Sequence, residues 1–420
     1  MEKNSPQRNY AAVILVFLIF WVISLLTNIL GALNPDIIQS FHLSLAMVAF
    51  LPFSFFIAYG VMSIPAGIML EKLSEKPVLV ASFFLAFLAS LLFALLPKFS
   101  VALPSLFLIG IGMAMLQVAI NPLLRASGGE EHFAFFSVFA QLIFGSASWI
   151  SPHIYSYLVL NLKDYAGGGN ALISMLAQVV PPHLPWISLY WVFAAVSLAM
   201  VIVIILYRLP KVELKEDEKA GAYEAYAQLF RSKTVILFFI GIFAYVGTEQ
   251  GVANWISKFL QTYHGLRPEI EGANAVAGFW GLMTIGCAIG LILLKLMDCR
   301  WVLVGAAICA MITLTLALFG PVGVSKVAFP WIGFFASVMW SIIFSLALNS
   351  VDKHHGSFSG ILCTGIIGGA IVPLIVGWIG DHLGLRFGLL FIYITLGYIL
   401  SIGFWARPLI KNATVWGNNQ

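Results

Sequence analysis

Twelve long apolar stretches divide this chain into two sets of six, separated by one strongly charged segment between Arg208 and Lys233. A helix needs about 20 apolar residues to cross a hydrocarbon core about 30 Å thick. The layout therefore predicts an all-α membrane protein with twelve transmembrane helices in two pseudo-symmetric six-helix bundles. The expected spans are 11–33, 43–70, 77–97, 102–125, 133–161, 186–208, 233–262, 272–297, 301–320, 326–350, 357–380 and 386–407.

Composition excludes several classes of protein. The chain is 61% hydrophobic and 10% charged, whereas a soluble domain is about 25% charged, so lipid is the expected solvent for most of it. No basic face indicates a nucleic-acid partner. No nucleophile–base pair, metal-ligand cluster or phosphate loop is apparent. We therefore expect no enzyme activity, no catalytic residue, no cofactor and no metal.

The predicted domains are a first bundle over 1–208, a cytoplasmic linker over 209–232 and a second bundle over 233–420. With the N-terminus inside, 16 of the 22 lysines and arginines fall on the cytoplasmic side, as the positive-inside rule requires. We expect a monomer in a cell membrane, a bacterial inner membrane above all, with both termini cytoplasmic.

One acidic residue, Glu249, lies near the middle of a predicted span. A charge deep in lipid is costly, so its presence calls for a reason. Tyr245 lies one turn earlier on the same helix face, and Asn254 follows within two turns. Facing a water-filled cavity, Glu249 could bind sugar hydroxyls, a proton or a sodium ion. The alternative is a structural carboxylate bonded to a neighbouring helix.

Amide side chains inside other spans suggest further substrate contacts. In span 4, Gln117 and Asn121 are four residues apart and share a face. Two amides on one face suit the alternating donors and acceptors of a sugar ring, although membrane bundles also use amides to join helices. Asn28 in span 1, Gln141 in span 5 and Asn254 complete the candidate set.

Aromatic and charged residues supply two weaker signals. Trp255, Trp280 and Trp340 lie deep in their spans, where one could stack on a sugar ring, although lipid contact or core packing explains any single one better. At the turn between spans 2 and 3, Glu71, Lys72 and Lys76 could pair with helix ends and hold one conformation shut. A plain topogenic loop is the alternative for these three charges.

The turn Gly67-x-x-x-Glu71-Lys72-x-x-x-Lys76 resembles a degraded signature of the major facilitator superfamily. Further motifs resemble the fucose–galactose–hexose symporter family within it, and the similarity covers nearly the whole chain. These motifs are Leu116-Gln117-Val118-Ala119-x-Asn121-Pro122, Tyr245-Val246-Gly247-x-Glu249, Ile343-Phe344-Ser345-Leu346-Ala347-Leu348, Ser359-Gly360 and Gly368-Gly369-Ala370-Ile371-Val372-Pro373.

The resemblance implies a monosaccharide substrate carried with a cation. Fucose/proton symporters of this family use an Asp in span 1 and a Glu in span 4, where this chain has Gly31 and Gln117. The glucose/galactose-type branch is more similar, because it also carries Gln in span 4 and Glu in the Tyr-Val-Gly-x-Glu motif. In span 5, the family pattern that supplies a Gln and an Asn reads Phe139 and Leu142 here. In span 8, the family's Gly-Arg pair reads Gly286-Cys287.

We therefore expect a secondary active importer of a hexose such as glucose or galactose, with a proton or sodium ion coupled through Glu249. The expected substrate contacts are Asn28, Gln117, Asn121, Gln141, Glu249 and Asn254. A drug or metabolite exporter on the same scaffold is the alternative, since few polar and many aromatic residues would suit a lipophilic substrate. A membrane sensor that binds without transporting is a third possibility.

Overall fold

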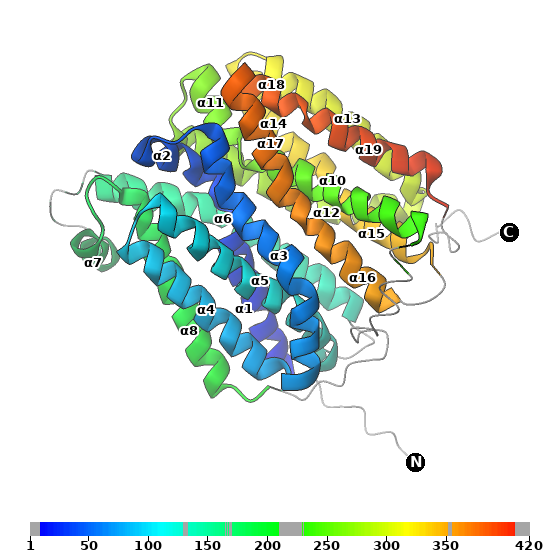
Figure 1. Ribbon diagram of the computed structural model, residues 1–420, viewed down its shortest axis with the longest axis horizontal. Coiled ribbons are helices and arrows are strands. Elements are labelled where there is room, and N and C mark those ends of the chain that lie inside the picture. Colours follow the sequence, from blue (N-terminus) through cyan, green and yellow to red (C-terminus); the bar gives the residue numbers. More distant parts are fainter. Residues whose placement is uncertain are drawn as a thin grey trace.

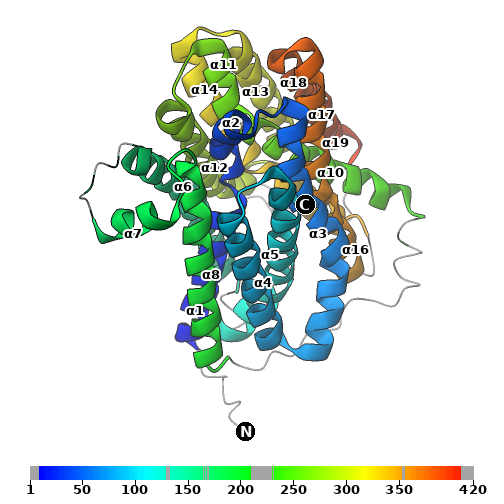
Figure 2. The same cartoon turned by 60° about the vertical axis from the view of Figure 1, so that its left-hand side comes forward.

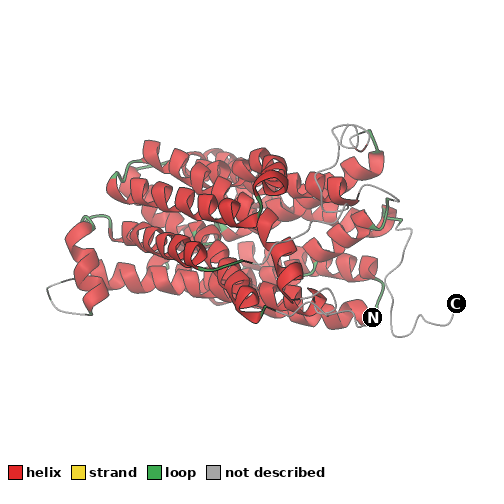
Figure 3. Cartoon of the chain, turned by 90° about the horizontal axis from the view of Figure 1, so that it is seen from below, coloured by secondary structure: helices red, strands yellow, loops and turns green. Residues whose placement is uncertain are grey.

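The computed structural model describes residues 9–128, 133–163, 165, 167, 170–209, 229, 231–351 and 355–407. Within these residues the chain is helical and has no strand (Figure 3). The side chains of residues 71, 121, 125, 133–135, 138 and 355–357 lie outside the description. Most of the predicted linker, residues 210–228 and 230, lies outside it too.

The helices before the linker form the first half of the chain, and those after it form the second half (Figure 1). The first half contains α1 (Tyr10–Thr27), α2 (Leu30–Phe41), α3 (Leu45–Leu73), α4 (Glu75–Leu95), α5 (Phe99–Gly128), α6 (Phe133–Lys163), α7 (Ala171–Val179), η2 (Pro185–Ile187) and α8 (Ser188–Leu206). The second half contains α10 (Lys233–Ala253), α11 (Ile256–His264), η3 (Pro268–Gly272), α12 (Ala273–Leu296), α13 (Cys299–Phe319), α14 (Val322–Ala336), α15 (Met339–Leu348), α16 (His355–Thr364), η4 (Gly365–Ile367), α17 (Gly368–Leu383), α18 (Leu385–Leu390) and α19 (Ile392–Trp405).

Eleven helical segments within the described residues are long and apolar enough to cross a membrane. They correspond to eleven of the twelve expected spans. The remaining expected span, 133–161, coincides with α6, a helix of 31 residues. Large apolar side chains such as Ile14 and Leu206 are 66% and 78% exposed, an exposure that water-soluble proteins avoid over large areas.

Two differences from the expected spans have local causes. The first span is longer than expected and reaches Phe41. Its helix is interrupted at Asn28 and Ile29 and resumes as α2. The connector between the expected spans 133–161 and 186–208 contains α7, whose first turn is capped by Asn170 Oδ1 accepting from the Ile173 N–H at 2.9 Å. This helix projects to one side of the molecule (Figure 2).

The two halves meet along two pairs of helices. In the first pair α3 packs against α17, and in the second α6 packs against α12; Figures 1 and 2 both show α3 beside α17. We call the end that holds the start of α3 and the end of α17 the far end. The near end holds Tyr10 and Trp405, the outer limits of α1 and α19. With the predicted orientation, the far end is the external one.

Small residues allow the close approach of helices across this boundary. A Cβ atom on Gly145 of α6 would lie 1.9 Å from Thr284 Oγ1 of α12, and one on Gly377 of α17 would lie 2.7 Å from the Leu45 carbonyl oxygen of α3. Membrane helices associate through such close backbone packing, because lipid provides no hydrophobic drive between them.

Candidate functional site

The seventh span is interrupted where α10 ends and α11 begins. The N–H of Trp255 bonds to the carbonyl of Val252 at 3.0 Å, three residues back, rather than to the residue four back. Asn254 Nδ2 donates to the Gln250 carbonyl at 2.8 Å. The carbonyl of Asn254 accepts from Asn34 Nδ2 of α2 at 2.7 Å. Interrupted helices of this kind carry the binding sites of many transporters.

Glu249 lies in the last turn and a half of α10, half-buried, in a row of hydrogen bonds. The hydroxyl of Tyr245 donates to its Oε2 at 2.5 Å, and Gln250 Nε2 donates to its Oε1 at 3.0 Å. Asn254 Nδ2 in turn lies 3.1 Å from Gln250 Oε1. No cation of the described residues pairs with this carboxylate. It is held by two neutral donors, so a proton or metal cation could still neutralise it.

The side chain of Asn28 forms its hydrogen bond within its own half of the chain. Its Nδ2 donates to Ser148 Oγ of α6 at 2.8 Å, and that hydroxyl lies 2.6 Å from Ser24 Oγ. The Asn28 side chain is 6% exposed. The amide therefore joins the break between α1 and α2 to the middle of α6.

Gln117 and Gln141 differ from Asn28 in having no hydrogen-bond partner within the described part of the chain. Gln117 is half-buried in the middle of α5, and Gln141 is exposed on α6. The side chain of Asn121 lies outside the described residues. An amide without a hydrogen-bond partner is unfavourable in lipid. We therefore expect the Gln117 side chain to face water or a ligand.

Hydrogen bonds thus join only part of the expected site. Glu249 and Asn254 are linked through Gln250, which the sequence analysis left out of the site. No described hydrogen bond joins them to Asn28, Gln117 or Gln141. Among the three deep tryptophans, Trp255 and Trp280 are buried, and their indole N–H groups have no partner among the described residues, whereas Trp340 is half-exposed.

Polar contacts hold the two halves together at the far end. The carboxylate of Asp381 in α17 accepts from the N–H groups of Leu45 and Ala46, at 2.7 and 2.8 Å. Lys163 of α6 and Glu269 of η3 form an ion pair at 3.6 Å. This closure could not be predicted from the sequence, because its donors and acceptors lie more than 100 residues apart.

The charges expected to act as a gate lie at the near end. Lys76 Nζ donates to the carbonyls of Ile205 and Tyr207 at 2.8 and 2.9 Å, where α8 ends in the same half of the chain. Lys72 is exposed, and the side chain of Glu71 lies outside the described residues. In this conformation Lys76 therefore caps a helix within the first half.

These features together define a class of protein. Long apolar helices fall into two halves that meet closely at one end, and an interrupted helix carries a carboxylate with no cationic partner among the described residues. Such a chain is a polytopic membrane carrier rather than a soluble protein or an enzyme.

Comparison with known proteins identifies the family. The sequence matches the Major Facilitator Superfamily over residues 16–366. It is 31% identical over 409 residues to the "Glucose/galactose transporter" of Brucella abortus biovar 1 (strain 9-941), covering 96% of this chain and 95% of that one. The chain therefore belongs to the Major Facilitator Superfamily, as its motifs predicted.

Other relatives have related names. The "L-fucose-proton symporter" of Escherichia coli (strain K12) is 25% identical over 385 residues, covering 87% of this chain and 86% of that one. The structure of the transporter FucP in its outward conformation aligns with a TM-score of 0.67 at 22% identity, over 94% of this chain and 98% of that one. These relatives are transporters, in agreement with the expectation that the chain is not an enzyme.

Proposed function

We propose that this protein imports a monosaccharide, a hexose such as glucose or galactose, by cation-coupled alternating access. The single observation that carries the proposal is Glu249, an intramembrane carboxylate with two neutral donors and no cationic partner among the described residues. A carboxylate without a cationic partner inside a span has a high free-energy cost, which a cation bound during the transport cycle would offset.

The relatives support the choice of substrate. The proteins that match over nearly their whole length are named for glucose and galactose or for L-fucose and a proton. All three sugars present hydroxyl groups around a ring, which amides recognise well. In this proposal Asn28, Gln117, Asn121, Gln141, Glu249 and Asn254 contact the sugar, and Glu249 also binds the coupling proton or sodium ion.

Alternating access would use the two halves as moving bodies. We assign residues 1–208 and 233–420 to the two bundles and 209–232 to the linker between them. The polar contacts at the far end support a conformation in which that end is closed. In the opposite conformation Glu71, Lys72 and Lys76 would help close the near end. We place the protein as a monomer in the lipid of a bacterial inner membrane, with both termini cytoplasmic.

Coupling follows from linkage. If the cation bound at Glu249 favours the sugar-binding conformation, the sugar must tighten cation binding by the same factor. A tenfold coupling requires only about 1.4 kcal/mol. One hydrogen bond gained or lost at Tyr245 or Gln250 is of that size.

Counterflow in proteoliposomes tests the proposal. Labelled glucose, galactose and fucose are offered to vesicles preloaded with unlabelled sugar, with and without proton and sodium gradients. We expect counterflow of at least one hexose without any gradient, and accumulation above equilibrium when one of the two gradients is imposed. Failure of every sugar, combined with export of a lipophilic cation, would replace the importer with the exporter alternative.

A pair of variants then tests Glu249. Glu249→Gln should retain counterflow but lose gradient-driven accumulation, because the amide cannot take up a cation. Glu271→Gln is the matched control: Glu271 Oε2 accepts from the Arg267 N–H at 3.1 Å in the far-end turn, and an amide oxygen can still do so. Unchanged accumulation in Glu249→Gln would remove Glu249 from the coupling mechanism.

A further inference from the structure

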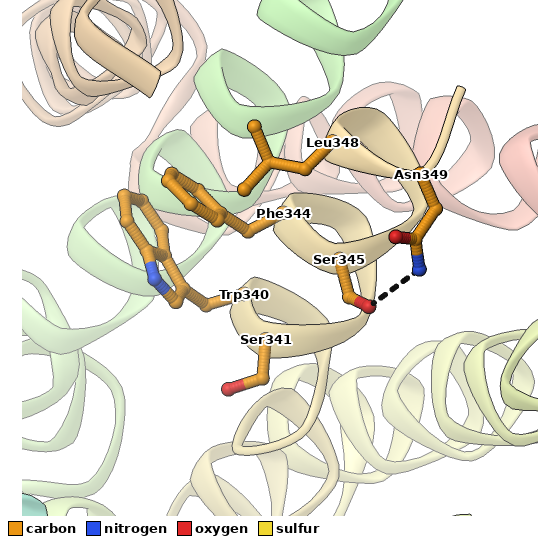
Figure 4. Close-up of a pocket in the computed structure, with 6 residues that line it drawn as sticks. All are labelled: Trp340, Ser341, Phe344, Ser345, Leu348 and Asn349. Carbon is orange, nitrogen blue, oxygen red and sulfur yellow. Dashed lines mark hydrogen bonds between the residues drawn. The ribbon is translucent and has the colours of Figure 1, made fainter. Parts of the chain in front are cut away.

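The helix α15 has one packed face and one open face. Met339, Ile342, Ile343, Leu346 and Ala347 are buried. The residues between these buried positions form the open face, which lines a cavity of about 400 Å³ (Figure 4). Its lining residues are Trp340, Ser341, Phe344, Ser345, Leu348 and Asn349.

This open face combines aromatic and hydroxyl groups. The rings of Trp340 and Phe344 stack with centroids 5.7 Å apart and planes 22° from parallel. Ser341 and Ser345, one turn apart, are both exposed, and Ser345 Oγ lies 3.4 Å from Asn349 Nδ2 (Figure 4). Two hydroxyls and an amide are unfavourable against hydrocarbon, so this face is suited to a wet passage rather than to lipid.

One residue connects the open face to the candidate ion site. The rings of Tyr245 and Trp340 lie 5.9 Å apart at an angle of 56°. The hydroxyl of the same tyrosine donates to Glu249 Oε2 at 2.5 Å. Trp340 is therefore separated from the Glu249 carboxylate by a single side chain.

We propose that Trp340 is the stacking platform for the sugar ring, with Phe344 behind it and Ser341 and Ser345 as donors and acceptors for the ring hydroxyls. This inference rests on the proposed function and deepens it by naming a substrate-binding surface that the polar residues alone do not supply. Trp340 is half-exposed, unlike the buried Trp255 and Trp280, so its face is available to a ligand.

The chemistry of a pyranose fits this surface. One face of the ring presents C–H groups, which pack on an aromatic plane, while its edge carries hydroxyls that need polar partners. Binding pockets for small molecules combine apolar walls with a few placed polar groups in the same way. An acyclic hexitol offers the same hydroxyls without a rigid C–H face, so a stacking platform discriminates against it.

The arrangement also gives Tyr245 a positioning role. A sugar ring resting on Trp340 limits the space beside the Tyr245 ring, and Tyr245 holds the Glu249 carboxylate. Sugar binding can thus reach the ion site through one packed contact and one hydrogen bond, without a long pathway.

Three variants test the platform by counterflow, in which unlabelled galactose or an acyclic hexitol competes with labelled hexose. Trp340→Ala should raise the half-saturation constant for the hexose at least tenfold and reduce its preference over the hexitol. Trp340→Phe, which keeps a smaller aromatic plane, should fall between Trp340→Ala and the wild type. Trp331→Ala is the matched control, because Trp331 lies on α14 of the same span, 41% exposed, and should change neither quantity by more than twofold.

The outcomes separate this inference from the proposed function. If the wild type exchanges hexoses and Trp340→Ala binds hexose and hexitol with unchanged constants, the platform is wrong and the transport function stands. If Trp340→Ala lowers only the maximal rate, with the preference for the ring intact, the residue has a structural role and the platform is again wrong. If the wild type exchanges no hexose, the proposed function itself is wrong.

Discussion

Asp381, near the end of α17, caps the start of α3 at Leu45, a residue 336 positions earlier in the chain. Its Oδ1 accepts from the Leu45 N–H at 2.7 Å, and its Oδ2 accepts from the Ala46 N–H at 2.8 Å. The first N–H groups of a helix have no partner within the helix, and an anion there also meets the positive end of the helix dipole. The contact joins the two halves only while the far end is closed.

Removing this cap should shift the conformational equilibrium. Loss of a helix cap costs about 0.5–2 kcal/mol, and in Asp381→Ala that cost falls on the far-end-closed state alone. The open population should therefore rise about 2- to 30-fold relative to the closed one. Distances between spin labels at Gln39 and Lys326, exposed at the far ends of the two halves, report the change on a background without native cysteines.

A second cap in the chain provides the control. Asp298 Oδ1 accepts from the Arg300 N–H at 2.9 Å at the start of α13, and donor and acceptor lie in the same half. Asp298→Ala should lower thermal stability and leave the distance distribution unchanged. Equal distributions in Asp381→Ala and the wild type would show that the Asp381 cap does not stabilise the closed state.

Asn28 and Gln117 should differ in their effect on stability, because Asn28 is hydrogen-bonded to Ser148 and Gln117 has no partner within the described residues. Asn28→Ala breaks the buried bond to Ser148, which should cost about 1–3 kcal/mol of stability and lower the melting temperature in detergent. Gln117→Ala breaks no bond within the described residues, so its melting temperature should change little.

Counterflow tests whether Gln117 contacts the sugar. If Gln117 contacts the sugar, Gln117→Ala should raise the half-saturation constant for hexose counterflow about tenfold, the equivalent of about 1.4 kcal/mol. In a second variant, Gln117→Glu, the rate of sugar exchange should depend on pH more steeply than it does in the wild type. A large loss of stability with an unchanged half-saturation constant would make Gln117 a structural amide.

Most of the architecture could be predicted from the sequence because lipid imposes a simple rule. A span must be long, apolar and helical, so the runs of apolar residues identify the helices directly. The ends were harder to place. The chain breaks at Asn28 and resumes helical geometry at Leu30, and such a break leaves no trace in hydropathy. The nine residues of α7 are too few to register as a span.

The candidate site could be predicted in part. Glu249 was identified by the cost of a charge in lipid, and its bond to Tyr245 follows from a spacing of four residues along one helix. The partners of Asp381 are backbone N–H groups 336 and 335 residues away, and backbone groups have no sequence signature. The open face of α15 depends on what packs against that helix, which one sequence does not reveal.

At Gly31 the absence of a side chain allows the two halves to approach at the far end. A Cβ atom there would lie 2.1 Å from the carbonyl oxygen of Ala253 and 3.3 Å from the Cα atom of Asn254. Both atoms belong to backbone at the break in the seventh span, so neither can move aside as a flexible side chain could. The Asp that the resemblance to fucose/proton symporters would place at Gly31 could not fit at this contact in the same conformation.

Gly31→Ala should therefore favour the far-end-open state. Overpacking costs about 1–3 kcal/mol, so the closed population should fall about 5- to 150-fold relative to the open one, and counterflow should slow accordingly. The spin labels at Gln39 and Lys326 measure the shift directly. Gly305→Ala on α13 is the matched control, because a Cβ atom there meets nothing within 4 Å. If Gly31→Ala and Gly305→Ala give the same distances and rates as the wild type, α2 and the end of α10 do not approach as closely during transport as they do here.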